Sequence, residues 1–271
     1  MNLKKYLNNK EDLPLLKRFA FTSGEDFNKK LDYLIKIAEP EDWNQTDIHT
    51  NKVNSTIFYY IIHTFEQLFN QEKIHVDEKE ENAFFNTGLM TTEGDEIFGH
   101  LIKSFYYDSN NPSSNYWYFK TFLKANEKEF LLKCTSKPEI ATYYNDFSEL
   151  YFNPYLDVEI NYEHIYEDNI ERLPHEIKAI DKETAKQILK ASLEFTKKKI
   201  KRNNRIPVPQ YYNSKLMFLI PVRVFSKKTI VVAVEKINNQ YIANTVLSMG
   251  MAYNCARLLN KPEIDWLFLK E

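Results

Sequence analysis

The sequence predicts an α+β fold, with an antiparallel sheet and covering helices in the C-terminal half and a helical N-terminal lobe that includes a β-hairpin. Apolar residues recur at helical spacing over 55–69 and 182–201, and β-branched residues fill three runs between 216 and 247. The chain has 271 residues, of which 43% are hydrophobic, so it can bury a substantial core. We expect a single elaborated domain over 1–271 with two lobes, about 1–133 and 134–271.

Helices open the N-terminal lobe. Residues 1–40 indicate short helices, and Pro40 ends the second of them because proline lacks a backbone N–H. That second helix carries apolar residues at helical intervals, namely Phe27, Leu31, Leu34, Ile35 and Ala38. The clearest helical pattern covers 55–69, where Asn54 or Ser55 can cap the first turn.

Strands complete this lobe. A short strand is predicted over 73–76, and residues 83–90 and 96–106 form a hairpin around the turn at 92–95. An aromatic run predicts a further strand over 116–124.

The C-terminal lobe begins irregularly over 134–154, and 157–171 reads as a strand that ends in a helical turn. Asp181 can cap a helix that runs to about Lys201. Its predicted inner face consists of Ala185, Ile188, Leu189, Ser192, Phe195 and Thr196.

The rest of the chain reads as three strands and a helix. The strands are predicted over 216–224, 229–237 and 241–247. Ser248 caps a helix that ends near Leu259, and Trp266 is expected to close the core.

Composition excludes several classes of protein. The net charge of −2 argues against a general DNA coat, so a polyanion would have to bind a local patch. Cys134 and Cys255 are too few for a Cys-rich zinc site, and we expect both to be reduced. The five glycines form neither a dinucleotide nor a phosphate-loop fingerprint, so we expect no cofactor. No two of the six histidines have metal-ligand spacing, so we also expect no metal.

We also expect no signal peptide and no membrane-spanning segment. Residues 1–10 lack the apolar core of a signal peptide, and no apolar run approaches about 18 residues. We therefore expect a cytoplasmic protein with no membrane contact.

A basic segment, residues 197–205, carries the strongest functional signal. Its six cations are Lys197, Lys198, Lys199, Lys201, Arg202 and Arg205. Pro207 and Pro209 then favour an extended backbone that leads to Gln210, Tyr211 and Tyr212. Cations neutralise phosphates and tyrosine rings stack on bases, which indicates RNA or a nucleotide. The alternative is a solvated helix end, because lysines there complement the helix dipole.

Three other places hold candidate residues. His164 and Asp168 are one helical turn apart, as a general base and its orienting carboxylate would be, or as a structural pair. Asn254 and Arg257 are neighbours on the last helix, where they could hold a phosphate or form only surface contacts.

The third place is a polar break in a strand. Asn86, Thr87 and Gly88 interrupt an apolar run, which predicts a bulge or a close approach by a ligand, with a turn into an edge strand as the alternative.

Several motifs appear in one order along the chain. They are Phe85–Leu89, Trp117–Lys120, Glu163–Ile165, Arg202–Asn204, Val208–Tyr212, Met251–Leu258 and Asp265–Leu267. Together they resemble the bacterial domain-of-unknown-function family 3825 over about Leu15 to Leu267. Members of that family can be joined to OST-HTH (LOTUS) modules, which bind RNA, so the resemblance implies a link to RNA.

The resemblance also selects residues. Positions that match the family pattern are Asn86, His164, Gln210, Tyr211, Asn254 and Arg257, and Lys120 and Thr87 lie within its motifs. The chain departs from the pattern at Gly250, where the family has an acidic residue, and at Cys255, where it has an asparagine.

The leading hypothesis is an RNA- or nucleotide-binding domain that acts in RNA processing or phage defence. Lys199, Arg202 and Arg205 would neutralise phosphates, and Tyr211 and Tyr212 would stack on bases. Gln210, Asn86 and Asn254 would read polar edges of the ligand, and Arg257 would clamp a phosphate.

Two alternatives stay open. One is a metal-independent phosphodiesterase or ribonuclease in which His164 is the base and Arg257 or Arg205 stabilises the charged transition state. The other is a scaffold that binds a protein partner through exposed aromatic residues. Neither the oligomeric state nor the existence of a reaction follows from the sequence.

Overall fold

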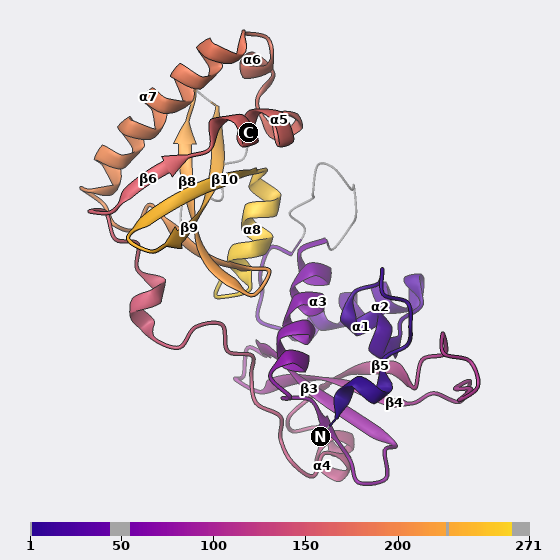
Figure 1. Cartoon of the computed structure of the whole chain (residues 1–271). Coiled ribbons are helices and arrows are strands. Elements are labelled where there is room, and N and C mark those ends of the chain that lie inside the picture. Colours follow the sequence, from indigo (N-terminus) through magenta and orange to yellow (C-terminus); the bar gives the residue numbers. More distant parts are fainter. Residues whose placement is uncertain (1, 44–54, 226–227, 262–271) are drawn as a thin grey trace. The chain divides into compact units, whose positions relative to one another are not determined.

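The computed structural model describes residues 2–43, 55–225 and 228–261 (Figure 1). Within it the chain divides into two compact units, unit 1 (Met1–Thr142) and unit 2 (Tyr143–Glu271). Each unit contains one five-stranded sheet with helices, which confirms the predicted α+β class. The division falls after residue 142, nine residues beyond the predicted lobe boundary at about 133.

The sheet of unit 1 has the order β1-β5-β4-β3-β2. Its strands are β1 (Ala20–Phe21), β2 (His75–Val76), β3 (Asn82–Met90), β4 (Glu96–Lys103) and β5 (Trp117–Lys124). The predicted hairpin is β3 and β4, and both β2 and β5 pair with it antiparallel. The hairpin is therefore the centre of a larger sheet, to which β1 adds a parallel edge.

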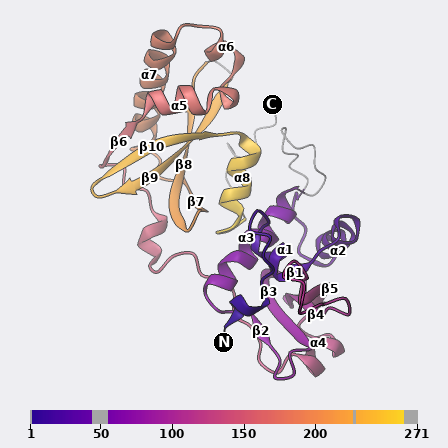
Figure 2. The same ribbon diagram turned by 45° about the vertical axis from the view of Figure 1, so that its right-hand side comes forward.

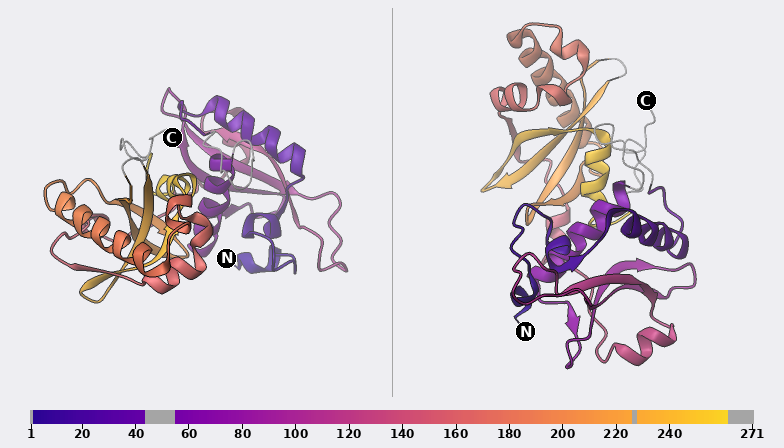
Figure 3. Two further views of the ribbon diagram at one scale, coloured as in Figure 1. Left: turned by 90° about the horizontal axis from the view of Figure 1, so that it is seen from above. Right: turned by 90° about the vertical axis from the view of Figure 1, so that its right-hand side faces the viewer.

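Helices cover both faces of this sheet (Figure 3). They are η1 (Leu3–Tyr6), α1 (Leu15–Phe19), α2 (Gly24–Ile37), α3 (Ser55–Asn70) and α4 (Lys128–Lys133). The predicted helices over 27–38 and 55–69 are α2 and α3, and they lie on one side of the sheet while α4 lies on the other. The proposed caps of α3, Asn54 and the side chain of Ser55, lie outside the described part of the structure.

The two faces follow from the alternation of side chains along the strands. Phe85 faces α3, where its ring meets Phe65 at 5.2 Å, whereas Phe84 and Phe98 pack with Phe130 of α4. Gly99 lies opposite Phe85 in the ladder, and a Cβ at Gly99 would be 2.1 Å from a Phe85 ring carbon. The glycine thus leaves the space that the Phe85 ring occupies.

The sheet of unit 2 has the order β6-β10-β9-β8-β7. Its strands are β6 (Asp157–Ile160), β7 (Val208–Tyr212), β8 (Lys215–Arg223), β9 (Thr229–Ile237) and β10 (Gln240–Leu247). The three predicted strands are β8, β9 and β10, which pair antiparallel. The sheet also gains β7, antiparallel to β8, and β6, which is parallel to β10.

Unit 2 is a three-layer structure in which α7 and α8 cover opposite faces of the sheet (Figure 2). Its helices are η2 (Phe147–Leu150), α5 (Tyr162–Asp168), η3 (Ile170–Arg172), α6 (His175–Lys178), α7 (Lys182–Ile200) and α8 (Met249–Arg257). Ile220 and Val232 pack in the cluster with α7, while Leu219 and Val231 pack in the cluster with α8. This alternation buries both faces of the strands and explains their nearly continuous apolar sequences.

The predicted starts of α7 and α8 are confirmed. Asp181 Oδ1 accepts a hydrogen bond from Thr184 N at 3.0 Å, and Ser248 Oγ accepts one from Met251 N at 3.3 Å. Both side chains satisfy N–H groups that have no partner inside the helix.

One part of the predicted inner face of α7 is wrong. Phe195 is 55% exposed, whereas Leu193 and Ile200 are buried against the sheet with Ala185 and Leu189. The buried positions follow helical steps of three and four residues and include Thr196. Phe195 comes one residue before Thr196 and therefore points about 100° away from it around the helix. The prediction for Trp266 falls outside the described residues.

No helix within the described ranges is long and apolar enough to cross a bilayer.

Candidate functional site

The basic segment comprises the last turn of α7 and the residues that follow it, and most of its cations face solvent. Lys197 forms an ion pair with Glu194 at 3.0 Å, so it is partly neutralised. The other five cations are exposed, namely Lys198, Lys199, Lys201, Arg202 and Arg205. Among the residues described, no carboxylate pairs with any of these five.

Local bonds hold part of this segment. Arg202 Nη1 donates to the Lys198 carbonyl at 2.9 Å, which satisfies one of the open carbonyls at the helix end. The Lys199 ammonium lies over the exposed Phe195 ring, 4.7 Å from its centroid. The helix dipole and these contacts account for cations at this position, but they leave five of the six cations without a carboxylate partner in the described part of the chain.

Strand β7 confirms the predicted extended backbone after the basic segment. It is the edge strand of its sheet, where proline is tolerated because no second neighbour needs its N–H. Tyr212 is 48% exposed, and the half-buried Tyr211 ring meets Tyr143 edge to face at 4.9 Å. Gln210 is only 1% exposed, because it shares the α8 face of β7 with Val208.

Helix α8 packs on β7, and this contact contains two amide oxygens without a hydrogen-bond partner among the described residues. They are Gln210 Oε1 and Asn254 Oδ1. Gln210 Nε2 has only a weak contact with the Met217 sulfur at 3.8 Å. Arg257, the expected neighbour of Asn254, is buried, so it is no surface clamp in this structure.

His164 forms the pair that the sequence indicated, with Nδ1 directed at the Asp168 carboxylate on α5. Both side chains are well exposed. The start of α7 lies beside α5, because Lys182 Nζ is 2.7 Å from Glu167 Oε1. Arg205 follows the other end of the 19-residue helix α7, about 28 Å away along its axis (Figure 1).

The second proposed arginine is also separated from His164. Ile165 of α5 packs in the cluster beneath α7, whereas α8, which carries Arg257, covers the opposite face of the sheet. The structure therefore brings His164 together with Asp168 but with neither Arg205 nor Arg257.

Asn86 and Thr87 form the predicted bulge, and both are buried. The ladder between β3 and β4 shifts register between Asn86 and Met90. Asn86 Nδ2 donates to Glu96 Oε1 at 3.0 Å and its Oδ1 accepts from Gly88 N at 2.9 Å. Thr87 Oγ1 donates to the Ile97 carbonyl at 2.6 Å.

Gly88 completes the bulge with a φ of +73°, and a Cβ there would lie 2.9 Å from the Tyr60 hydroxyl. The polar groups at this break are used within the fold, which matches the bulge interpretation of the sequence and leaves no open group for a ligand at Asn86.

Lys120 belongs to a charged cluster that sequence reasoning missed. Its Nζ is 2.5 Å from Glu129 Oε1, and Lys133 Nζ is 2.9 Å from the same oxygen. Next to this carboxylate lies the fully buried His100, whose Nδ1 is 3.8 Å from Glu129 Oε1. The ring stacks on Phe84 at 4.5 Å.

The cluster fixes the protonation of His100. Asn82 Nδ2 donates to Asp77, so Asn82 Oδ1 is left to accept from His100 Nε2 at 3.0 Å. Burial lowers the His100 pKa to about 4, although Glu129 opposes this. Hydrogen bonds from Lys120 and Lys133 lower the pKa of Glu129 to about 2. Two lysines thus neutralise this carboxylate, which explains why it does not keep the imidazole charged.

Nucleophile and metal chemistry find no support in the described residues. Cys134 and Cys255 are free, and burial raises their pKa values to about 11 and about 12, so both thiols stay protonated at neutral pH. No group of three His, Cys, Asp or Glu side chains is placed to hold a metal ion within the described ranges.

Comparison with known proteins supports the resemblance at the level of the family. Neither the curated proteins nor the solved structures gave a match. The association with OST-HTH modules stays a prediction. A family model described as a domain of unknown function (DUF3825) matches residues 34–266, so the chain belongs to the DUF3825 family.

Proposed function

We propose that unit 2 binds RNA through the basic segment at the end of α7 and the tyrosines of β7. The observation that carries this proposal is a set of five exposed cations with no carboxylate partner among the described residues. Some lysines elsewhere in the described chain are paired, as Lys182 is with Glu167 and Lys215 with Glu235, and others are not. The basic segment differs in that its exposed cations without a carboxylate partner all lie between residues 198 and 205. Unpaired cations on one segment favour a multiply charged partner, because each phosphate contact releases counterions.

Exposed aromatic surface on the next strand supports a nucleic acid over a simple anion. Tyr212 has nearly half of its surface open, and Tyr211 offers a ring already held by Tyr143. A base can stack on such a ring regardless of its sequence. We therefore propose single-stranded RNA as the partner, and a cytoplasmic role in RNA processing or phage defence is the broader form of this proposal.

Burial changes the roles first assigned to several residues. Gln210, Asn86 and Arg257 are buried, so they are not part of the proposed contact surface. Charge neutralisation is assigned to Lys199, Arg202 and Arg205, and stacking to Tyr212 with support from Tyr211. The separation of His164 from both arginines does not favour the phosphodiesterase alternative.

The test is RNA binding by the double variant Arg202→Ala/Arg205→Ala, measured by fluorescence anisotropy with labelled single-stranded RNA at several salt concentrations. We expect weaker binding, and a slope of log K against log[salt] that is less steep by about 1.4 because two phosphate contacts are lost. The double variant Lys190→Ala/Arg223→Ala removes the same charge from other exposed positions and should bind like the wild type. If the first variant folds and keeps both the affinity and the slope, the proposal is wrong.

One observation keeps a protein partner as a second candidate. Phe105 and Tyr106, in the loop after β4, are 93% and 87% exposed and pack edge to face only on each other. Two large exposed aromatic rings are typical of an interaction surface. Phe105→Ser/Tyr106→Ser should then abolish any concentration-dependent self-association seen by analytical ultracentrifugation, and it should leave RNA binding unchanged.

A further inference from the structure

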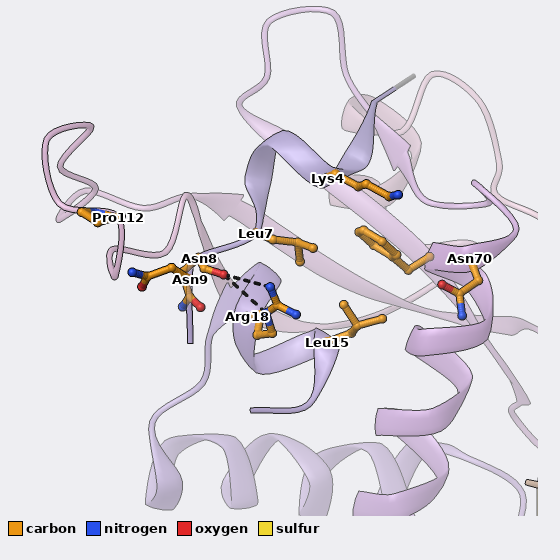
Figure 4. A pocket seen from close by; sticks show the side chains of 9 residues that line it. Lys4, Leu7, Asn8, Asn9, Leu15, Arg18, Asn70 and Pro112 are labelled. Atoms are coloured by element: carbon orange, nitrogen blue, oxygen red, sulfur yellow. Dashed lines mark hydrogen bonds between the residues drawn. The ribbon is translucent and has the colours of Figure 1, made fainter. Parts of the chain in front are cut away.

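We propose that unit 1 contains a separate site for an organic phosphomonoester, a phosphate dianion on a largely apolar body. The site is a pocket of about 600 Å³ between the N-terminal segment, α1 and the end of α3 (Figure 4). Its volume is within the range of pockets that bind small molecules, about 300–1,000 Å³. This site does not involve the basic segment of unit 2, so the proposal does not depend on RNA binding and is tested separately from it.

The charge of the lining indicates an anion. Lys4 and Arg18 supply two full positive charges, and none of the described residues that line the pocket is acidic. Figure 4 shows Leu7 between the two cationic side chains in this view, so they reach the pocket from different parts of the chain. Two cations without an acidic neighbour suit a phosphomonoester, which carries between 1.5 and 2 negative charges at about pH 7.

Arg18 is held in place before any ligand binds. Its Nε and Nη2 donate to the Asn8 carbonyl at 3.4 and 3.3 Å, and Asn8 N donates back to the Arg18 carbonyl at 3.0 Å. These bonds use one side of the guanidinium and leave the Nη1 protons to donate elsewhere. A guanidinium fixed in this way loses little side-chain entropy when it binds an oxyanion.

Asn8 supplies a second, independent observation. The residue lines the pocket and is 97% buried, since only 3% of its surface is exposed. The Oδ1 atom accepts from Lys10 N at 3.1 Å, which fixes the orientation of the amide. Its Nδ2 is left without an acceptor among the described residues. A buried donor of this kind needs an acceptor, and a phosphate oxygen is a suitable one.

The remaining wall favours an organic body on the anion. Leu7, Leu15 and Phe69 line the pocket beside the cations, and Phe69 is buried by contacts with Phe19 and Phe65. An inorganic ion would leave this apolar wall uncovered, whereas a compact ring would remove it from water. The geometry therefore selects aromatic phosphomonoesters over free phosphate.

The test is isothermal titration calorimetry of the whole chain with phenyl phosphate as the probe, compared with benzoate, phenol and inorganic phosphate. We expect phenyl phosphate to bind more tightly than the other three. Lys4→Gln, at an exposed position, should lower the affinity for phenyl phosphate at least about tenfold, because it removes a charge-assisted contact. Lys10→Gln removes an exposed charge nearby that does not line the pocket, and it should have no effect.

Asn8→Asp provides the second variant. It keeps the oxygen that accepts from Lys10 N but replaces the open donor with a carboxylate oxygen, so binding should be lost while the fold is retained. The Arg202→Ala/Arg205→Ala variant should bind phenyl phosphate like the wild type, which separates this site from the RNA surface. The proposal is overturned if phenyl phosphate fails to bind at millimolar concentration, if it binds no better than phenol, or if Lys4→Gln and Asn8→Asp bind as the wild type does.

Discussion

The buried imidazole of His100 should make unit 1 sensitive to mild acid. The folded state lowers the His100 pKa from 6.5 to about 4, so the unfolded chain takes up a proton at a higher pH than the folded chain. Stability that is present above pH 6.5 is therefore lost as the pH falls toward 4. Protonation inside the fold is unfavourable because the ring is fully buried between Phe84 and a carboxylate already paired with two lysines.

The magnitude follows from the two pKa values. Linkage gives a loss of about 2 kcal/mol in the free energy of unfolding between pH 7 and pH 5, and the loss approaches about 3 kcal/mol near pH 4. The lowered pKa of Glu129 acts in a different window, because stability from a carboxylate is lost only below its unfolded pKa of about 4.5. His75, whose pKa is also lowered by burial, contributes in the same direction.

The assay is urea unfolding at pH 7 and pH 5, followed by tryptophan fluorescence, since Trp43 and Trp117 are both buried in unit 1. His100→Gln keeps a side-chain N–H that can reach Asn82 but has no imidazole to protonate. The variant should be less stable than the wild type at pH 7, and its free energy of unfolding should fall by about 2 kcal/mol less than that of the wild type on going to pH 5. His164→Gln removes an exposed imidazole from unit 2 and serves as the control. Equal losses in the wild type and His100→Gln would refute the reasoning.

Three further predictions concern stability. Gly99→Ala places a Cβ 2.1 Å from a Phe85 ring carbon and should destabilise unit 1 by about 3 kcal/mol in urea unfolding, whereas Gly24→Ala, with open space around its Cβ, should cost nothing. Asp181→Ala removes the cap of α7 and should lower the stability of unit 2 by about 1 kcal/mol, measured the same way. Gln210→Met removes a buried oxygen without a partner and should leave the thermal midpoint unchanged or raise it; a large drop would show that the oxygen is satisfied.

The elements that could be predicted are those in which the pattern of apolar residues repeats over several periods of a helix or strand. Helix α7 and strands β8, β9 and β10 each bury several residues on a regular stripe or face, so periodicity alone identifies them. Helix α4 was missed because its six residues bury only Phe130 and no period is completed. The two-residue strand β1 exists through its partner β5 and carries no local signal, whereas β2 lies within the strand predicted over 73–76.

The same distinction applies to the candidate site, where some features follow from the local sequence and others depend on how separate elements pack. Exposure of the cations in 197–205 follows from composition, because uncompensated charges stay in water. Burial of Gln210 depends on which face of β7 meets α8, and that face is set by the pairing of β7 with β8. The apolar residue Val208 indicates which face is buried, because Gln210 lies two residues after it and residues two apart in a strand point the same way. The His100 cluster joins residues from separate elements, and no spacing in the sequence reveals it.

Unit 2 contains two features that lower its stability and that folding does not explain. Like charges crowd the end of α7, because Lys198 and Lys199 stand in its last turn and Lys201 and Arg202 follow directly, and neighbouring like charges repel each other. Gln210 and Asn254 bury amide oxygens without partners where β7 meets α8. A chain selected for stability alone would pair or replace these groups, and such local conflicts are expected where a protein binds something else. Because β7 follows the basic segment directly, Gln210 lies in the stretch of chain to which RNA binding is assigned, although its buried side chain is not part of the contact surface, and Asn254 of α8 packs against this stretch.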